Sequence, residues 1–198
     1  MKKLFKLLVI AAVVVTSAPA FAQGSFSMQY SMGFGMGDSK SYINAPSFRG
    51  ATMEYRHLVT DDMAIGLDVS WNVFYERRAS DTYTSGTVSL TGVQYRYVNA
   101  VPIYVSVDKY FGMGKKVNPF VGLGIGTMYT RRNTDMNLYT LETDSWAFAL
   151  RPEAGIRYDV STGMDLILAL KYNYGLSTTD LPAQSYLALN VGFVFKKR

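Results

Sequence analysis

The sequence predicts an all-β protein, and two observations lead to that prediction. Large apolar side chains alternate with small or polar ones over most of the chain, and short polar, glycine-containing stretches interrupt the alternation at intervals. Successive residues of a β-strand point to opposite faces, so a period of two gives each strand one apolar face and one polar face. The stretch 24–36, GSFSMQYSMGFGM, is the clearest case, because every even position from Phe26 onward is large and apolar. A helix would spread these side chains around its circumference.

The first 22 residues are predicted to be a signal peptide. Three lysines precede the apolar run Leu7–Val15, and Ala20, Phe21 and Ala22 form a small-x-small cleavage site. A membrane anchor is the alternative, but the apolar run is shorter than the ~20 residues that a spanning helix needs. We therefore expect residues 1–22 to be removed and residues 23–198 to form one domain.

The charge of the exported chain does not favour a nucleic-acid partner. The sequence has 20 basic and 15 acidic residues, and three lysines leave with the signal peptide, so 17 bases remain against 15 acids. Three of these bases are the last three residues, so the excess of positive charge is mostly an effect of the chain end. The chain has no cysteine, which excludes a lipid-attachment cysteine and a disulfide framework.

The alternation predicts eight strands, joined by connections that alternate between long and short. The third strand is expected to end where polar residues begin at Arg77. The fourth is expected to be one long strand, because the odd-numbered positions stay on the apolar face through Asn99. We call the face assigned to alternate positions of a strand its parity. The predicted strands are 24–36, 50–56, 63–76, 87–111, 120–129, 146–158, 166–174 and 187–195. The predicted loops are 37–46, 77–86, 131–144 and 175–184.

An even strand count with short turns at one end and longer loops at the other is typical of a bacterial outer-membrane barrel. Strands of about 13 residues tilted by ~40° cover roughly 30 Å, which is enough for the ~25 Å apolar band of such a barrel. The prediction is an eight-stranded antiparallel transmembrane β-barrel, an up-and-down meander with both termini on the periplasmic side.

A soluble barrel has the same period with its apolar face inward, so composition has to decide which face is outside. The polar face is rich in glycine and alanine and poor in lysine, whereas the apolar face has no charge in its central band. Aromatic residues bracket that band, as at lipid interfaces: Tyr55, Phe111, Tyr158 and Phe195 on one side, and Tyr75, Tyr129, Trp146 and Tyr174 on the other. We therefore expect a plugged lumen with a charge network of Glu54, Arg56, Asp68, Glu76, Arg96, Asp108, Arg151, Glu153, Arg157, Asp159 and Lys171.

Four segments carry a resemblance to a known family: YRHLVTDDMAIGLDVSWN, PIYVSVDKYFG, NPFVGLGIGTMY and the terminal LNVGFVF. The chain resembles the small outer-membrane β-barrel proteins, the group that includes OmpA-type barrels, OmpX and opacity-type proteins. The resemblance covers nearly the whole mature chain, and none of the segments is a catalytic signature. It implies that Phe195 acts as the signal for the outer-membrane assembly machinery, although Lys196–Arg198 follow it here.

No catalytic, metal or cofactor site is predicted. The single histidine, His57, falls near a periplasmic turn on the lipid-facing parity, where an interfacial polar residue is the simpler interpretation than a general base. The series Gly122, Gly124 and Gly126 lies in a strand with no helix after it, so it predicts room in the lumen rather than a phosphate loop.

The sequence therefore predicts a non-enzymatic integral outer-membrane protein with a structural or surface-interaction role through its extracellular loops. A narrow pore for small solutes and a lipid-modifying enzyme are the alternatives. The expected partners are membrane lipid, lipopolysaccharide, the assembly machinery and an extracellular ligand, and the protein is expected to be a monomer.

Two further predictions concern the outer side. Residues 87–111 are long enough either to protrude above the membrane with the third strand or to bend near Pro102, which cannot donate to a ladder. Arg77 and Arg131 continue the outward parity at the ends of the third and fifth strands, about 10 Å apart. Because a guanidinium matches a phosphate well, this pair is predicted to contact lipopolysaccharide, with two solvated loop residues as the alternative.

Overall fold

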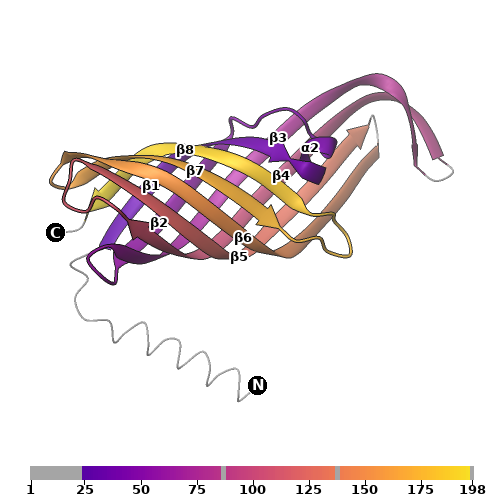
Figure 1. Ribbon diagram of the computed structural model, residues 1–198. Coiled ribbons are helices and arrows are strands. Elements are labelled where there is room, and N and C mark those ends of the chain that lie inside the picture. Colours follow the sequence, from indigo (N-terminus) through magenta and orange to yellow (C-terminus); the bar gives the residue numbers. More distant parts are fainter. Residues whose placement is uncertain (1–23, 86–87, 137–138, 197–198) are drawn as a thin grey trace, which may run out of the picture.

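The computed structural model describes residues 24–85, 88–136 and 139–196, and in them eight antiparallel strands close into a barrel in chain order (Figure 1). The strands are β1 (Gly24–Met36), β2 (Gly50–Leu58), β3 (Met63–Ser85), β4 (Val88–Tyr110), β5 (Val117–Met136), β6 (Tyr139–Ser161), β7 (Met164–Gly175) and β8 (Gln184–Lys196). A short helix, α2 (Gly37–Tyr42), follows β1. The predicted fold is confirmed. The predicted signal peptide and Gln23 lie outside the described residues.

The strands are strongly tilted in the barrel. A path of paired residues that starts at Phe26 on β1 and crosses every strand returns to β1 at Met36, ten residues further on. With ~3.3 Å per residue and ~4.8 Å between strands, a shear of this size in eight strands corresponds to a tilt of about 41°.

The apolar parity faces outward and the polar parity faces the lumen. Leu168 on β7 is 42% exposed, whereas Asn190, on the neighbouring β8 with the opposite parity, is fully buried. Aromatic pairs stand on the outward face toward one end, with ring centroids 5.0 Å apart for Tyr75 and Tyr97 and 5.2 Å apart for Tyr129 and Trp146. This arrangement agrees with a barrel whose outer surface meets lipid.

Two hairpins, β3–β4 and β5–β6, extend beyond the rest of the barrel at one end, which we call the outer end (Figure 1). In the ladders they continue past the aromatic pairs. β3 continues to Ser85 and pairs with β4 as far as Val88, and β5 pairs with β6 as far as Met136 and Tyr139. The predicted loops 77–86 and 131–144 are therefore wrong, because these polar residues form strands above the apolar band, where both faces of a sheet can meet water. We call this four-stranded extension, residues 77–85, 88–96, 131–136 and 139–145, the outer sheet.

The fourth strand is continuous, as predicted, and rises within the outer sheet instead of bending away. Pro102 pairs with Met128 on β5, while the ladder between β3 and β4 lacks the two pairs between Val69–Ile103 and Asn72–Ala100. The missing N–H of proline is thus accommodated by a local gap on one side of the strand.

The predicted loop 37–46 contains the six-residue helix α2, which the sequence did not predict. Gly37 starts it with φ of 49°, a left-handed conformation that favours glycine. The chain then turns into the barrel mouth, where Ile43 is 1% exposed. The connection between β1 and β2 therefore closes the outer end of the lumen.

Candidate functional site

The centre of the lumen holds a connected layer of seven charged side chains, each no more than 5% exposed. They are Glu54, Arg56, Asp68, Asp108, Arg151, Glu153 and Lys171. Their four carboxylates and three cations give the layer a net charge of −1. We call it the charge layer.

Arg56 is the hub of the charge layer. Its guanidinium donates to Asp68 at 2.7 Å, to Glu153 at 3.2 Å and to Asp108, and it lies 3.5 Å from Glu54. Four strands thereby meet at one side chain, because these carboxylates belong to β2, β3, β4 and β6.

The other two cations join the remaining carboxylates. Arg151 lies 2.7 Å from Asp68 and 3.0 Å from Glu153, while the Lys171 ammonium contacts Glu54 and lies 3.2 Å from Glu153. A glycine makes room for this packing: a Cβ at Gly124 would stand 3.2 Å from Cβ of Tyr104, whose ring lies under the Arg151 guanidinium.

Apolar clusters lie on both sides of the charge layer. Toward the outer end the cluster contains Ile43, Phe74, Val98, Ala100, Tyr104, Met128, Ala149, Tyr186 and Ala188. Toward the inner end it contains Ala64, Tyr110, Phe120, Ile167, Ala169 and Val194. The cavity beneath Ile43 measures only about 20 Å³, so side chains fill the outer part of the lumen, above the charge layer.

Three arginines hold the α2 connection in the mouth. The Arg96 and Arg132 guanidinium carbons lie 4.7 and 4.6 Å from the centre of the Tyr42 ring, and Arg96 donates to the Tyr42 carbonyl oxygen at 3.0 Å. Arg78 donates to the same carbonyl at 3.4 Å and to that of Ser41 at 3.3 Å. These bonds satisfy carbonyl groups at the end of the helix.

Four of the predicted network residues lie outside the charge layer. Glu76 accepts hydrogen bonds from the backbone N–H groups of Asn44 (2.5 Å) and Ala45 (3.3 Å), so like Arg96 it holds the α2 connection. Arg157 and Asp159 lie at the inner end, where Asp159 pairs with Lys196 at 3.4 Å. The prediction of one network of eleven residues is therefore wrong for these four, because their positions along the barrel axis keep them apart.

The register does not bring Arg77 and Arg131 together. Arg77 pairs with Tyr95, which pairs with Asp135, four residues beyond Arg131. Two strand spacings of ~4.8 Å and four residues of ~3.3 Å put the two arginines about 16 Å apart. The predicted distance of about 10 Å is wrong, and Arg131 is also paired with Glu142 at 2.5 Å. Contact of either residue with lipopolysaccharide stays a prediction.

The outer sheet has two free edges. Pairing of β3 with β2 ends at Asn72, and pairing of β6 with β7 ends at Ala149. Within the described residues, 74–85 and 139–147 therefore have a strand neighbour on one side only. On β6, Tyr139 and Leu141 continue the lumen-facing parity, yet they are 63% and 67% exposed.

The remaining predicted residues have simple surroundings. His57 pairs with Gly24 and Ile65 close to the turn between β2 and β3, and Phe195 lies outward beside Phe26. No group of three or more metal-ligating side chains occurs in the described part of the chain. Nor does any helix among these residues have the length and apolar character to cross a membrane.

Sequence reasoning missed the residues that seal the outer mouth. Tyr42 and Ile43 are the only large apolar residues in an otherwise polar connection, SKSYINAPS, and that contrast was the available signal. For Arg132 the available signal was parity, because Arg132 continues the lumen-facing parity of its strand whereas its neighbour Arg131 continues the outward one.

Comparison with known proteins agrees with this geometry. The chain matches the model of the outer membrane protein beta-barrel domain over residues 8–195. It is similar in structure to Neisserial surface protein A (16% identity, TM-score 0.52) and to OprG from Pseudomonas aeruginosa (13% identity, TM-score 0.53), each over 88% of this chain and 96% of the other. A search of curated proteins gave no match. At these identities the structural likeness shows the fold alone, but the family model covers most of the sequence, and the chain therefore belongs to the outer membrane protein beta-barrel domain family of the cell outer membrane.

Proposed function

We propose that the protein is a non-catalytic, non-conducting outer-membrane barrel that presents its outer sheet as an interaction surface. The observation that carries the proposal is the continuous pairing of β3 with β4 and of β5 with β6 far above the aromatic pairs. About ten residues of β3 above Tyr75, at ~3.3 Å each and a tilt of about 41°, lift the tip of the hairpin by roughly 25 Å. A barrel that only had to cross the membrane would not need this height.

The filled lumen supports the absence of conduction. A solute would have to pass the outer apolar cluster and the charge layer below it. Displacing any member of that layer would leave a buried charge without its partner, which costs several kcal/mol. Steady single-channel currents from the purified protein in planar bilayers would overturn this part of the proposal and favour the narrow pore.

The free edge of β6 supports a role in binding. An exposed strand edge offers unpaired N–H and C=O groups to a partner chain, and Tyr139 and Leu141 add apolar surface beside it. Glu142 and Asp144 on the opposite face are the kind of charges that limit unspecific pairing.

The proposal extends to the partners of the barrel. The protein is expected to act as a monomer, to meet lipopolysaccharide in the outer leaflet, and to present Phe195 to the assembly machinery, while an extracellular ligand contacts the outer sheet. The outward exposure of Phe195 at the end of the last strand supports its role.

Trimming the outer sheet tests the proposed function. We would remove residues 79–93 and join Arg78 to Gln94, which are paired in the ladder, by a two-residue Asn-Gly turn. Cells that carry this variant should lose adhesion to protein-coated or polysaccharide-coated surfaces, and the barrel should still be inserted and heat-modifiable in gels. Equal adhesion of trimmed and full-length protein on every surface would refute the proposal.

A milder double variant tests whether adhesion depends on the exposed apolar side chains or only on the height of the outer sheet. Tyr139→Thr with Leu141→Thr keeps β propensity but removes the exposed apolar surface, and should weaken adhesion. Thr140→Ser, on the other face of the same strand, is the matched control and should leave adhesion unchanged.

A further inference from the structure

The inner end of the barrel contains a cavity of about 290 Å³ that faces the periplasm, because the short turns of an outer-membrane barrel lie on that side. We call it the inner vestibule. Residues of all eight strands and of the turn between β4 and β5 line it. Its deepest side chains, Arg56 and Tyr110, are 3% and 2% exposed. The vestibule is therefore a built pocket below the sealed part of the lumen.

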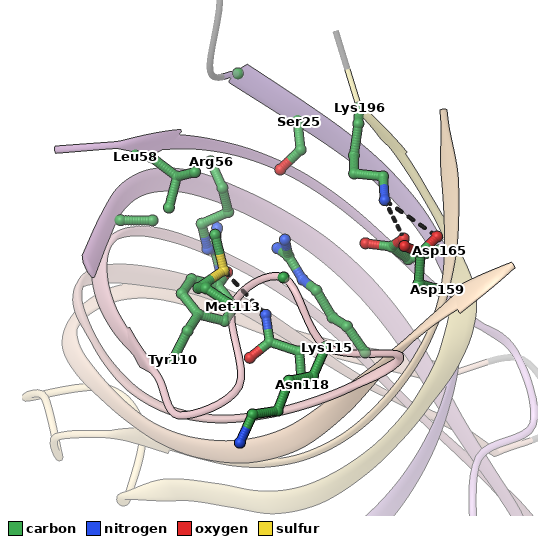
Figure 2. A pocket seen from close by; sticks show the side chains of 14 residues that line it. Ser25, Arg56, Leu58, Tyr110, Met113, Lys115, Asn118, Asp159, Asp165 and Lys196 are labelled. Atoms are coloured by element: carbon green, nitrogen blue, oxygen red, sulfur yellow. Dashed lines mark hydrogen bonds and ion pairs between the residues drawn. The ribbon is translucent and has the colours of Figure 1, made fainter. Parts of the chain in front are cut away.

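On one wall of the vestibule the charged side chains form ion pairs with one another. Lys196 lies 2.6 Å from Asp165 and 3.4 Å from Asp159, and Figure 2 shows these three side chains together. Arg56, at the floor, is already bound by the carboxylates of the charge layer. Lys196 and Arg56 are therefore already neutralised by carboxylates and are not available to a ligand.

The other two cations of the vestibule, Arg157 and Lys115, have no carboxylate partner among the described residues. Arg157 has its guanidinium carbon 4.8 Å from the centre of the Tyr110 ring and 6.0 Å from that of Phe120, and it forms no ion pair in the part of the chain that the structure describes. Its Nε atom and the Tyr110 hydroxyl are both buried without a hydrogen-bond partner there. Lys115 lies on the turn that crosses the mouth (Figure 2) and likewise has no carboxylate partner among the described residues.

The shape of the turn keeps Lys115 at the mouth. Gly114, next to it, has φ of 79°, which favours glycine, and the Lys115 N–H donates to the carbonyl of Gly112 at 2.9 Å. The turn is further tied down by the side-chain oxygen of Asn118, which accepts a hydrogen bond from the N–H of Gly112 at 3.0 Å. Lys115 is thus presented by an ordered turn.

We propose that the inner vestibule binds a small anion from the periplasm, a carboxylate or phosphate group, beside Arg157 and Tyr110, with Lys115 adding positive charge at the mouth. Buried polar groups and charges normally have partners, and one oxyanion can accept from both the Arg157 guanidinium and the Tyr110 hydroxyl. The volume is at the lower limit for a ligand pocket, which suits a small anionic group with few further atoms. This inference does not depend on the proposed role of the outer sheet.

Isothermal titration of the protein in an uncharged maltoside detergent tests the site, with sodium phosphate and sodium acetate as separate probes and sodium chloride at equal ionic strength as the reference. Saturable binding of one or both probes is expected. Phosphate alone would indicate a phosphate-bearing ligand, and acetate alone would indicate a carboxylate-bearing one. Binding of neither probe above chloride would overturn the proposal.

Variants locate the anion in the vestibule. Arg157→Gln should weaken binding at least tenfold, and Lys115→Ala should weaken it less, because Lys115 is more exposed. Lys116→Ala is the matched control: this neighbouring lysine lies 5.4 Å from the Tyr158 ring, does not line the vestibule, and should bind as the unchanged protein does. Equal affinities of Arg157→Gln and Lys116→Ala would refute the site.

Two further variants keep the test decisive if Arg157→Gln does not fold. Tyr110→Phe removes only the unpaired hydroxyl and should weaken binding severalfold while it keeps the ring under Arg157. Arg157→Lys keeps the positive charge and should retain part of the affinity. If neither change alters binding, the Arg157 side chain only covers the two rings and the proposal fails.

Discussion

The charge layer makes Lys171→Met a sensitive test of how the lumen is stabilised. Lys171 is 2% exposed and neutralises Glu54 and Glu153 together, so its loss changes the net charge of the layer from −1 to −2. At 3.2 Å and an effective dielectric constant of ~20, a single pair is worth about 5 kcal/mol before the desolvation of the ammonium is subtracted. Removal of one partner of a buried pair typically costs about 3–5 kcal/mol, and we expect that loss here.

The assay is equilibrium unfolding in urea with the protein in lipid vesicles, followed by tryptophan fluorescence. Trp71 and Trp146 are 57% and 58% exposed on the lipid face, so their emission reports on loss of the membrane-inserted barrel. Glu54→Gln in the Lys171→Met background removes one of the stranded carboxylates and should recover part of the stability.

The matched control for this experiment is Leu170→Met, the same new side chain one residue earlier on the lipid face, which should cost less than ~1.5 kcal/mol. If Lys171→Met loses no more than this control, ion pairing does not stabilise the lumen and our account of the charge layer is wrong.

Three further predictions follow from the faces of the barrel. Leu168→Arg should cost about 2–4 kcal/mol because it puts a charge in lipid, and a lipid-dissolved quencher should reach a label on a cysteine at 168 but not at 190. Ile43→Ala should destabilise the protein by about 2–5 kcal/mol without opening a conductance, since the charge layer persists below it; a new current would show that Ile43 alone seals the lumen. Arg77→Glu and Arg131→Glu should reduce the stability gained from lipopolysaccharide additively, because residues about 16 Å apart seldom couple; strong coupling would support the single phosphate site that the register argues against.

Alternation alone predicted the part of the fold that crosses the membrane. The stretch 24–36 is a strand with these limits, and Leu168 and Asn190 face lipid and lumen as their parity requires. A period of two is reliable here because one face must be apolar over the whole height of the lipid.

Above the lipid this constraint ends, and the sequence was misleading there. In 77–86 and 131–144 both faces of a strand meet water, so the same polar composition fits a loop or a sheet, and only pairing with a neighbouring strand decides. The helix α2 is too short to show a helical period.

The contacts of the charge layer could not be read from parity either. Parity placed eleven charges on the lumen side, but which of them meet depends on the stagger of the strands around the ring. Arg151 and Arg157 share one strand and one parity, yet Arg151 lies in the charge layer and Arg157 lies in the inner vestibule.

The continuity of β3 and β4 from the barrel to the tip of the outer sheet has a mechanical consequence. A pull on the hairpin tip acts along the strands, whereas the ladder hydrogen bonds run perpendicular to them. The load is therefore applied in shear and is shared by many bonds at once, and it passes directly into the wall of the barrel in the membrane. A flexible loop of the same length would stretch before it transmitted any force. The paired strands of the outer sheet are stiff, and they transmit the force to the barrel at the level of the aromatic pairs.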